Sequence, residues 1–287
     1  MPAEERTYLI TGANTGIGLA TAKELARRGG RVLVGARSAE KGRAAVDAIV
    51  RDTGNERVDV LTVDLGDLAS VVSAARGFFD SGRPLHVLVN NAGVGGQKGR
   101  TAQGFEIHFG VNHLGHFLLT NLLLDRLRES ARSAGRPSRV VNVSSDAHYQ
   151  AGGVPFDDLR SEPSLTGVKE YAVSKLCNVL FAEELARRVP ADELVSVSLH
   201  PGVIASDIWR RVPGPARWLM KRFMKSTDEG AETSVFCATA PEVDTTTGAF
   251  YDNCRVKAAS PVVTPELGRL LWERSEEWTK EFRPGTR

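Results

Sequence analysis

Short runs of β-branched and aliphatic residues alternate with longer helical patterns along most of this chain. This rhythm predicts a doubly wound α/β fold, in which helices cover both faces of a mostly parallel sheet of about seven strands. Right-handed crossovers in such a sheet place ligands at the carboxyl ends of the strands, so we expect the chemistry in the loops that follow them. The expected strands are 8–10, 32–34, 58–63, 85–89, 139–143, 194–199 and 248–251. The clearest helical patterns are 17–28, 39–51, 68–79 and 265–282.

The composition favours one globular domain over residues 1–287. Of these residues 41% are hydrophobic, and no linker, internal repeat or low-complexity tract divides the chain. Lysine and arginine together number 37 against 35 acidic residues, which leaves a net charge of +2. So small a charge gives no large positive field, and nucleic-acid binding is not expected.

The sequence also bears on cellular location. Residues 1–6 are charged and contain no apolar signal core, and the apolar stretch 117–124 is far shorter than the ~18 residues needed to span a bilayer. We therefore expect neither a signal peptide nor a transmembrane helix. Cys177, Cys237 and Cys254 lack CxxC spacing and are expected to be reduced thiols of a cytoplasmic protein.

Tyr171 and Lys175 are four residues apart in a segment that we expect to be helical. At this spacing their side chains share one helix face. A free tyrosine has a pKa near ~10, and a nearby cation stabilises its phenolate. Lys175 could therefore prepare Tyr171 for acid–base chemistry, although the same spacing occurs on many solvated helices.

The loop 11–18, Thr-Gly-Ala-Asn-Thr-Gly-Ile-Gly, follows the first expected strand and opens the first helix. Its glycines let the backbone turn tightly and approach a pyrophosphate, whose charge would lie at the positive helix N-terminus. The strand–turn–helix context supports dinucleotide binding, although the GxxxGxG spacing differs from the commoner GxGxxG. The expected cofactor contacts in this loop are Gly12, Asn14, Thr15, Gly16, Ile17 and Gly18.

This spacing resembles the TGxxxGxG motif of the short-chain dehydrogenase/reductase family, and further family motifs follow in order. Asn91, Ala92 and Gly93 belong to a sequence similar to the NNAG motif, which braces the sheet and lines the cofactor site. The resemblance covers nearly the whole chain and is closest to the retinol-dehydrogenase-like subgroup, which shares VNVSS, the later YxxxK and HPGV. It implies a Rossmann-like fold that binds a nicotinamide dinucleotide. The further cofactor contacts that it implies are Asp64, Leu65, Tyr171, Lys175, Pro201, Gly202, Val203 and Ser206.

The resemblance also implies four catalytic residues. Tyr171 would give or take the hydroxyl proton, and Ser145 would hydrogen-bond the same oxygen. Lys175 would lower the pKa of Tyr171 and bind the ribose, while Asn112 would hold a water that relays protons toward the lysine. Ser145 matches the family's substrate-oriented position better than Ser144 does; alternatively, both serines only cap the strand end.

Arg37, at the end of the second expected strand, bears on cofactor choice. An acidic residue at this place would bind a free adenosine ribose, whereas an arginine complements a 2′-phosphate. Arg37 therefore favours NADP(H) over NAD(H). Lys41 could add to the same positive pocket or be a solvated helix charge.

His113 and His116 are three residues apart on an expected helix, a spacing that can chelate zinc. No convincing cysteine, histidine or carboxylate accompanies them, so we expect no metal and interpret both as helix or interface residues.

The segment 203–228 follows the sixth expected strand, where the family closes over its substrate. It mixes large apolar residues such as Trp209, Trp218 and Phe223 with several lysines and arginines. It could be an apolar lid, a basic helix resting on a membrane surface, or a packing or subunit-contact helix in a homo-oligomer. We favour the lid, and with it a lipophilic carbonyl or alcohol substrate. The retinol-dehydrogenase-like branch often carries a membrane anchor that this sequence does not display, so retinoid turnover in particular is not implied.

Two functional hypotheses from different classes follow. The leading hypothesis is an NADP-dependent oxidoreductase that reduces a hydrophobic ketone or aldehyde. The alternative is a non-catalytic nucleotide-binding redox sensor or scaffold, which the presence of Asn112, Ser145, Tyr171 and Lys175 together disfavours. An epimerase or dehydratase of the extended branch fits less well, because the chain leaves little room for a separate substrate domain.

Overall fold

The structure of the protein is a computed structural model, which describes residues 6–161, 164, 166–202 and 227–283. Most of the expected lid segment, with Val203 and Ser206, lies outside these residues.

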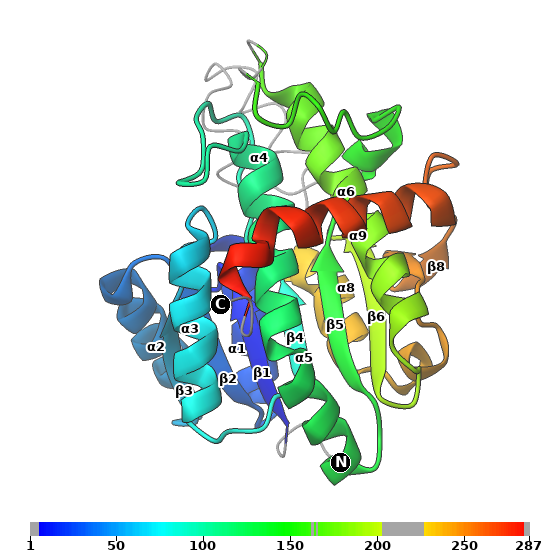
Figure 1. Ribbon diagram of the computed structural model, residues 1–287. Helices are drawn as coiled ribbons and strands as arrows, with labels where there is room; N and C mark the ends of the chain where they lie inside the picture. The colour runs from blue at the N-terminus through cyan, green and yellow to red at the C-terminus, as the bar shows by residue number, and fades with distance from the viewer. Residues whose placement is uncertain (1–5, 162–163, 165, 203–226, 284–287) are drawn as a thin grey trace, which may run out of the picture.

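The described residues form one eight-stranded sheet in the order β3-β2-β1-β4-β5-β6-β7-β8 (Figure 1). All neighbours pair in parallel except β7 and β8, which are antiparallel. The strands are β1 (Thr7–Thr11), β2 (Arg31–Ala36), β3 (Val58–Thr62), β4 (Val87–Asn90), β5 (Ser138–Val143), β6 (Leu194–His200), β7 (Phe250–Asp252) and β8 (Arg255–Lys257). The predicted α/β fold is confirmed, and the seven expected strands are all present.

Helices lie on both faces of the sheet. One face is covered by α1 (Gly16–Arg27), α2 (Ala39–Thr53) and α8 (Thr227–Thr239). The other is covered by α3 (Leu68–Asp80), α5 (Gly115–Ala134) and α6 (Val168–Arg188). The C-terminal helix α9 (Pro265–Thr279), red in Figure 1, crosses over α5 and α6. A short α4 (Ile107–Phe109) and a π-helical turn at Gly110–Leu114 lead into α5.

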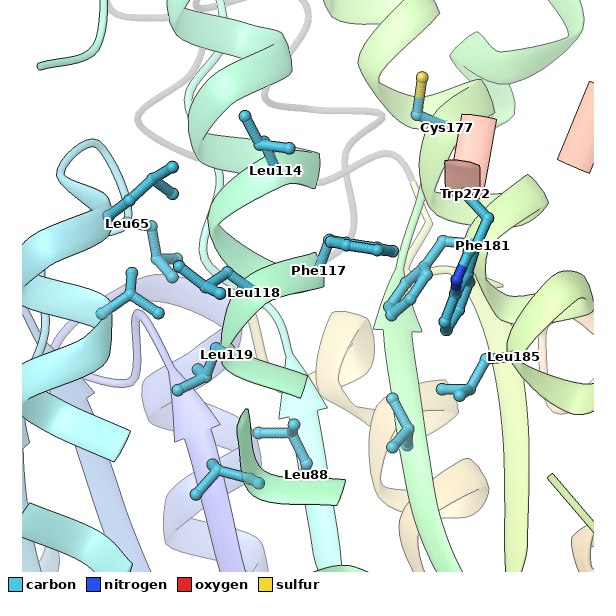
Figure 2. Close-up of a cluster of buried hydrophobic side chains, with 14 of the residues drawn as sticks. Leu65, Leu88, Leu114, Phe117, Leu118, Leu119, Cys177, Phe181, Leu185 and Trp272 are labelled. Carbon is cyan, nitrogen blue, oxygen red and sulfur yellow. The ribbon is translucent and has the colours of Figure 1, made fainter. Parts of the chain in front are cut away.

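The strands are buried on both faces, because successive side chains alternate between two cores. In β1, Leu9 packs toward α3, α5 and α6, whereas Tyr8 and Ile10 pack toward α1 and α8. In the first core an aromatic group joins three helices (Figure 2): Trp272 of α9 lies 5.0 Å from Phe117 and 5.8 Å from Phe181 between ring centroids. These contacts attach α9 to α5 and α6.

The eighth strand was not expected from the sequence. It forms a hairpin with β7 through Asn253 and Cys254, whose φ angles are 48° and 59°. A tight hairpin turn with two left-handed residues usually carries Asn-Gly, and a cysteine at the second position hides that signal. The expected helix 265–282 ends at Thr279 and continues as a short 3₁₀ turn.

None of the described helices is long and apolar enough to cross a membrane. All three cysteines are unpaired, and Cys177 and Cys237 are buried.

Candidate active site

The carboxyl end of β5 holds the middle of α6 through hydrogen bonds in both directions. The Lys175 ammonium donates to the Val143 carbonyl at 2.9 Å, and Asn178 Nδ2 donates to the same oxygen at 3.1 Å. In return, the Ser144 hydroxyl donates to the Lys175 carbonyl at 2.7 Å. We call this arrangement the β5–α6 clamp. It places Tyr171, one turn earlier on α6, within hydrogen-bonding reach of the Ser145 side chain.

The electrostatics of Tyr171 differ from the sequence-based expectation. We expected Lys175 to lower the pKa of Tyr171 together with the charge of a bound nicotinamide; in the protein without cofactor, burial raises this pKa, and the hydrogen bond with Ser145 offsets part of that rise. The Lys175 ammonium lies 5.6 Å from the centre of the Tyr171 ring and bonds to the Val143 carbonyl instead. In the described structure the serine, rather than the lysine, therefore stabilises the phenolate.

Lys175 itself is strongly affected by its surroundings. Its side chain is buried, and this desolvation lowers its pKa to about 8. The ammonium therefore loses its proton much more easily than an exposed lysine, which suits a group that passes protons at moderately alkaline pH.

Ser145 both caps a turn and faces the phenol. Its Oγ accepts a hydrogen bond from the Ala147 N–H at 3.2 Å at the start of the 3₁₀ turn Asp146–Gln150. Its carbonyl accepts a hydrogen bond from Nδ1 of the buried His148 at 2.8 Å, and His148 Nε2 accepts one from the Ser260 N–H at 3.1 Å. Sequence reasoning missed His148, which ties the serine turn to the C-terminal part of the chain.

Asn112 lies in the π-helical turn and is fully buried. Its Oδ1 accepts from the Val94 N–H at 2.8 Å, and its Nδ2 donates to the Val94 carbonyl at 3.1 Å and to the Ser174 hydroxyl at 2.9 Å. Asn112 thus joins the loop after β4 to helix α6. A methyl group placed on Gly93 would lie 3.4 Å from Asn112 Oδ1 and 3.6 Å from the Lys175 ammonium, so both groups border this glycine.

The loop after β1 has the shape that a pyrophosphate requires. Gly12 adopts a φ of +66°, and a Cβ on Gly18 would lie 2.4 Å from Asn91 Nδ2, so neither position tolerates a larger residue. Thr15, the N-cap of α1, makes no side-chain cap hydrogen bond, whereas the N-cap side chains of α2, α3 and α9 each accept one. The Thr15 side chain therefore does not cap the first turn of α1, whose N–H groups could bind an anion, and the residues of this loop fit the pyrophosphate of a dinucleotide.

Thr11 connects this loop with the loop after β4. Its hydroxyl oxygen accepts hydrogen bonds from the main-chain N–H groups of Asn91 and Ala92, both at 3.0 Å, and Asn91 Nδ2 donates to the Thr11 carbonyl at 2.7 Å. Sequence reasoning took Thr11 as part of the glycine motif and assigned it no role of its own. Its place at the end of a strand, where the glycine motif begins, could have indicated that its hydroxyl bonds a neighbouring loop.

The expected adenosine contacts lie on neighbouring strand ends. Arg37 is exposed after β2. Asp64 follows β3, and its Oδ1 accepts from the Gly66 N–H at 2.9 Å. The Leu65 side chain is buried in the core (Figure 2), so only its main chain could face a cofactor. The Lys41 side chain is exposed at the first turn of α2.

Pro201 and Gly202 follow β6, where the next residues lie outside the described chain. His200, just before them, accepts a hydrogen bond on Nδ1 from the Asp146 N–H at 3.2 Å. This contact joins the end of β6 to the turn that Ser145 caps.

Of the two expected interpretations of His113 and His116, as helix or as interface residues, the helical one is confirmed: His113 lies in the π-helical turn and His116 in α5, and both are buried. His113 Nε2 lies 3.0 Å from the Ser275 hydroxyl of α9. His116 lies between the Asn112 carbonyl, at 3.0 Å, and the Thr11 hydroxyl, at 2.8 Å. Each side chain thus has protein partners, and no group of three or more metal-binding side chains occurs in the part of the chain that the structure describes.

Comparisons with known proteins agree with this geometry. The family model described as short chain dehydrogenase matches residues 6–214. Retinol dehydrogenase 12 of Homo sapiens is 46% identical over 276 residues, which cover 95% of this chain and 85% of that protein. A crystal structure of an uncharacterized protein from Mycobacterium Paratuberculosis has a TM-score of 0.75 at 34% identity, covering 96% of this chain and 94% of the other. The Pseudomonas aeruginosa RhlG/NADP active-site complex has a TM-score of 0.71 at 25% identity, covering 87% and 96%.

Fold, site and relatives together define an oxidoreductase that uses a nicotinamide dinucleotide and acts on CH–OH groups. The chain belongs to the short-chain dehydrogenase/reductase family, in its retinol-dehydrogenase-like subgroup.

The lowered pKa of Lys175 predicts that burying its charged form decreases the free energy of unfolding. Between pH 8 and the ordinary lysine pKa of ~10.4, the unfolded chain binds more protons than the folded one, so wild-type stability should rise with pH in this window. Below pH 8 the full cost is present. Lys175→Met should therefore unfold with a free energy up to about 3 kcal/mol larger at pH 7, and this advantage should shrink toward pH 10.5.

Urea unfolding of both proteins from pH 7 to 10.5 measures the difference. Lys41→Met, which removes an exposed lysine, is the control and should change stability little at any pH. A Lys175→Met protein less stable than wild type at pH 7 would show that the buried ammonium is net stabilising.

Proposed function

We propose that this protein uses NADPH to reduce a hydrophobic ketone or aldehyde in the cytoplasm, with Tyr171 as the proton donor. The observation that carries the proposal is the β5–α6 clamp, which presents a buried phenol to the Ser145 hydroxyl beside a lysine with a low pKa. Three groups that can hold and protonate one oxygen are thereby gathered at the carboxyl end of β5.

When bound, the dinucleotide supplies the hydride that attacks the carbonyl carbon. Ser145 donates a hydrogen bond to the carbonyl oxygen and fixes its position. Tyr171 gives its phenolic proton to the same oxygen as negative charge develops there. The raised pKa of Tyr171 keeps the phenol protonated at neutral pH, which is the form that reduction requires.

Lys175 and Asn112 restore the proton of Tyr171. With a pKa of about 8, the Lys175 ammonium releases a proton readily, and Asn112 lies beside it across Gly93. In this proposal the same ammonium also binds the nicotinamide ribose. Because Asn112 also bonds Ser174 on α6, it holds this part of the site to the helix that carries the tyrosine.

Two features support NADPH rather than NADH. Arg37 is exposed at the end of β2, where the adenosine ribose lies in this fold, and its guanidinium complements a 2′-phosphate. The similar structure of Pseudomonas aeruginosa RhlG is named as a complex with NADP. A cytoplasmic NADP pool kept reduced would drive the reaction toward the alcohol.

The substrate class rests on the relatives and on composition. Retinol dehydrogenase 12 is named for a large apolar alcohol, and the residues expected to close the site include two of the chain's four tryptophans and two of its three methionines. Affinity should therefore rise with the apolar area of the carbonyl, at roughly 25 cal/mol per Å² buried. A series of ketones and aldehydes of increasing chain length or ring number, followed by NADPH absorbance, will identify the best substrate.

Tyr171→Phe tests the role of the phenol on that substrate. It removes the reacting proton but keeps the ring, so kcat should fall at least ~100-fold while the Kd for NADPH stays within about twofold. Stopped-flow turnover and NADPH fluorescence titration separate the two effects. A variant that retained near-normal kcat would show that another group donates the proton.

Arg37→Asp tests the cofactor assignment. It should weaken NADPH binding by about 1–3 kcal/mol and narrow or reverse the preference over NADH, because a charge-assisted contact becomes a repulsion. Arg51→Asp makes the same charge change on an exposed residue at the other end of α2 and should leave both affinities nearly unchanged. Equal affinities of the unmodified protein for NADPH and NADH would refute the assignment.

A further inference from the structure

We propose that His116 is a positioning residue, which as a neutral imidazole with its proton on Nδ1 fixes the dinucleotide-binding loops to the turn that carries Asn112. This inference rests on the cofactor site proposed above and adds to it a residue outside the expected motifs. It concerns binding of the dinucleotide, so it can be tested without turnover.

The partners of His116 determine where its proton lies. Nδ1 is 3.0 Å from the Asn112 carbonyl oxygen, which can only accept, so Nδ1 carries the hydrogen. In a neutral imidazole Nε2 is then an acceptor, and the Thr11 hydroxyl at 2.8 Å donates to it. The other possible acceptor for this hydroxyl, the Val89 carbonyl, is farther away at 3.4 Å.

Once the Thr11 hydroxyl donates to His116, its oxygen remains free to accept from two directions. It receives the main-chain N–H groups of Asn91 and Ala92, both at 3.0 Å. Donors and acceptors therefore match from the Asn112 carbonyl through His116 and Thr11 to the loop after β4. Reversing the imidazole tautomer would point an N–H at a hydroxyl oxygen that already accepts two hydrogen bonds, and would leave a bare nitrogen facing a carbonyl.

The surroundings keep His116 neutral. Its side chain is only 2% exposed, and burial lowers its pKa to about 4, with the nearby Lys175 charge adding to the decrease. Protonation would place a second positive charge beside the Lys175 ammonium and would deprive Thr11 of its acceptor. Above about pH 5 the hydrogen-bonded chain should therefore stay intact.

This chain joins the two halves of the site. Thr11, Asn91 and Ala92 belong to the loops expected to hold the dinucleotide, whereas Asn112 borders Lys175 across Gly93. Asn112 bonds the loop after β4 directly through Val94, whereas His116, from α5, links Asn112 to Thr11 in the loop after β1. Loss of the imidazole should therefore loosen the cofactor loops relative to the catalytic side chains.

His113 provides a matched control. It is equally buried and lies one turn earlier along the chain. Its partner is Ser275 of α9, whereas the partner of His116 is Thr11 in the first cofactor loop. His113→Leu and His116→Leu remove the same chemical group from comparably buried positions. A general loss of packing should affect both variants alike, whereas loss of the Thr11 contact affects only one.

NADPH fluorescence titration of the full-length protein is the first measurement. His116→Leu should raise the Kd for NADPH at least about tenfold, while His113→Leu should leave it within about twofold. His116→Gln, whose amide oxygen can still accept from Thr11, should recover part of the lost affinity. Equal weakening in the two leucine variants, or none in His116→Leu, would overturn the proposal.

Nitrogen NMR of the unmodified, uniformly ¹³C,¹⁵N-labelled protein tests the tautomer and does not depend on whether a variant folds. The His116 ring resonances, assigned through correlations to its own backbone, should show Nδ1 protonated and Nε2 bare, unchanged from pH 5.5 to 8. A protonated Nε2, or a titration within this range, would refute the assignment. If NADPH binds as predicted but no carbonyl is reduced, the proposed reaction is wrong and the role of His116 stands.

Discussion

The buried Lys175 ammonium is the constraint on which the site depends. An unpaired charge in the interior costs several kcal/mol, so this group must have a hydrogen-bond acceptor, and it has the carbonyl at the end of β5. That requirement fixes the rotation and height of α6 against the sheet. Tyr171 and Ser145 meet because one lies a turn before the lysine and the other lies just past the strand end. Burial of the Lys175 ammonium is unfavourable in itself, but its hydrogen bond to the strand carbonyl fixes the position of the Tyr171 side chain.

A second network is built around Thr11 and meets the first at Asn112. The asparagine amide donates to Ser174, whose hydroxyl in turn donates to the Tyr171 carbonyl at 2.8 Å. Polar contacts therefore run without interruption from the loop after β1 to the turn of α6 that carries the phenol. Parallel strands make this possible, because their carboxyl ends all lie at one edge of the sheet.

The sequence predicted the parts of this protein that depend on local pattern. Apolar runs predicted the seven main strands, and the glycine loop and the Tyr171–Lys175 pair pointed to the two halves of the candidate site. Contacts between distant residues were not predictable. Thr11 and His116 are 105 positions apart, and nothing in either local sequence indicates the other. The β7–β8 hairpin was missed for the opposite reason, since its turn is local but carries Cys254 where glycine is usual.

The effect of burial on Tyr171 was unpredictable for the same physical reason. Spacing shows that a lysine shares a helix face with a phenol, but it does not show that burial outweighs the charge or that the ammonium bonds a strand carbonyl instead. Proximity in sequence brought the two side chains together, but it did not indicate how strongly burial acts on the phenol in the protein without cofactor. Only the surrounding packing decides which protonation state the phenol favours.

The pKa of Tyr171 tests this account most directly. The chain has four tyrosines, so ultraviolet difference titration of the wild type against Tyr171→Phe isolates one phenol. We predict a pKa above 10 in the protein without cofactor, and a still higher value when Ser145→Ala removes the hydrogen bond that opposes burial. A pKa below 10, or one that Ser145→Ala leaves unchanged, would contradict the conclusion that the β5–α6 clamp presents a buried, serine-bonded phenol to the substrate.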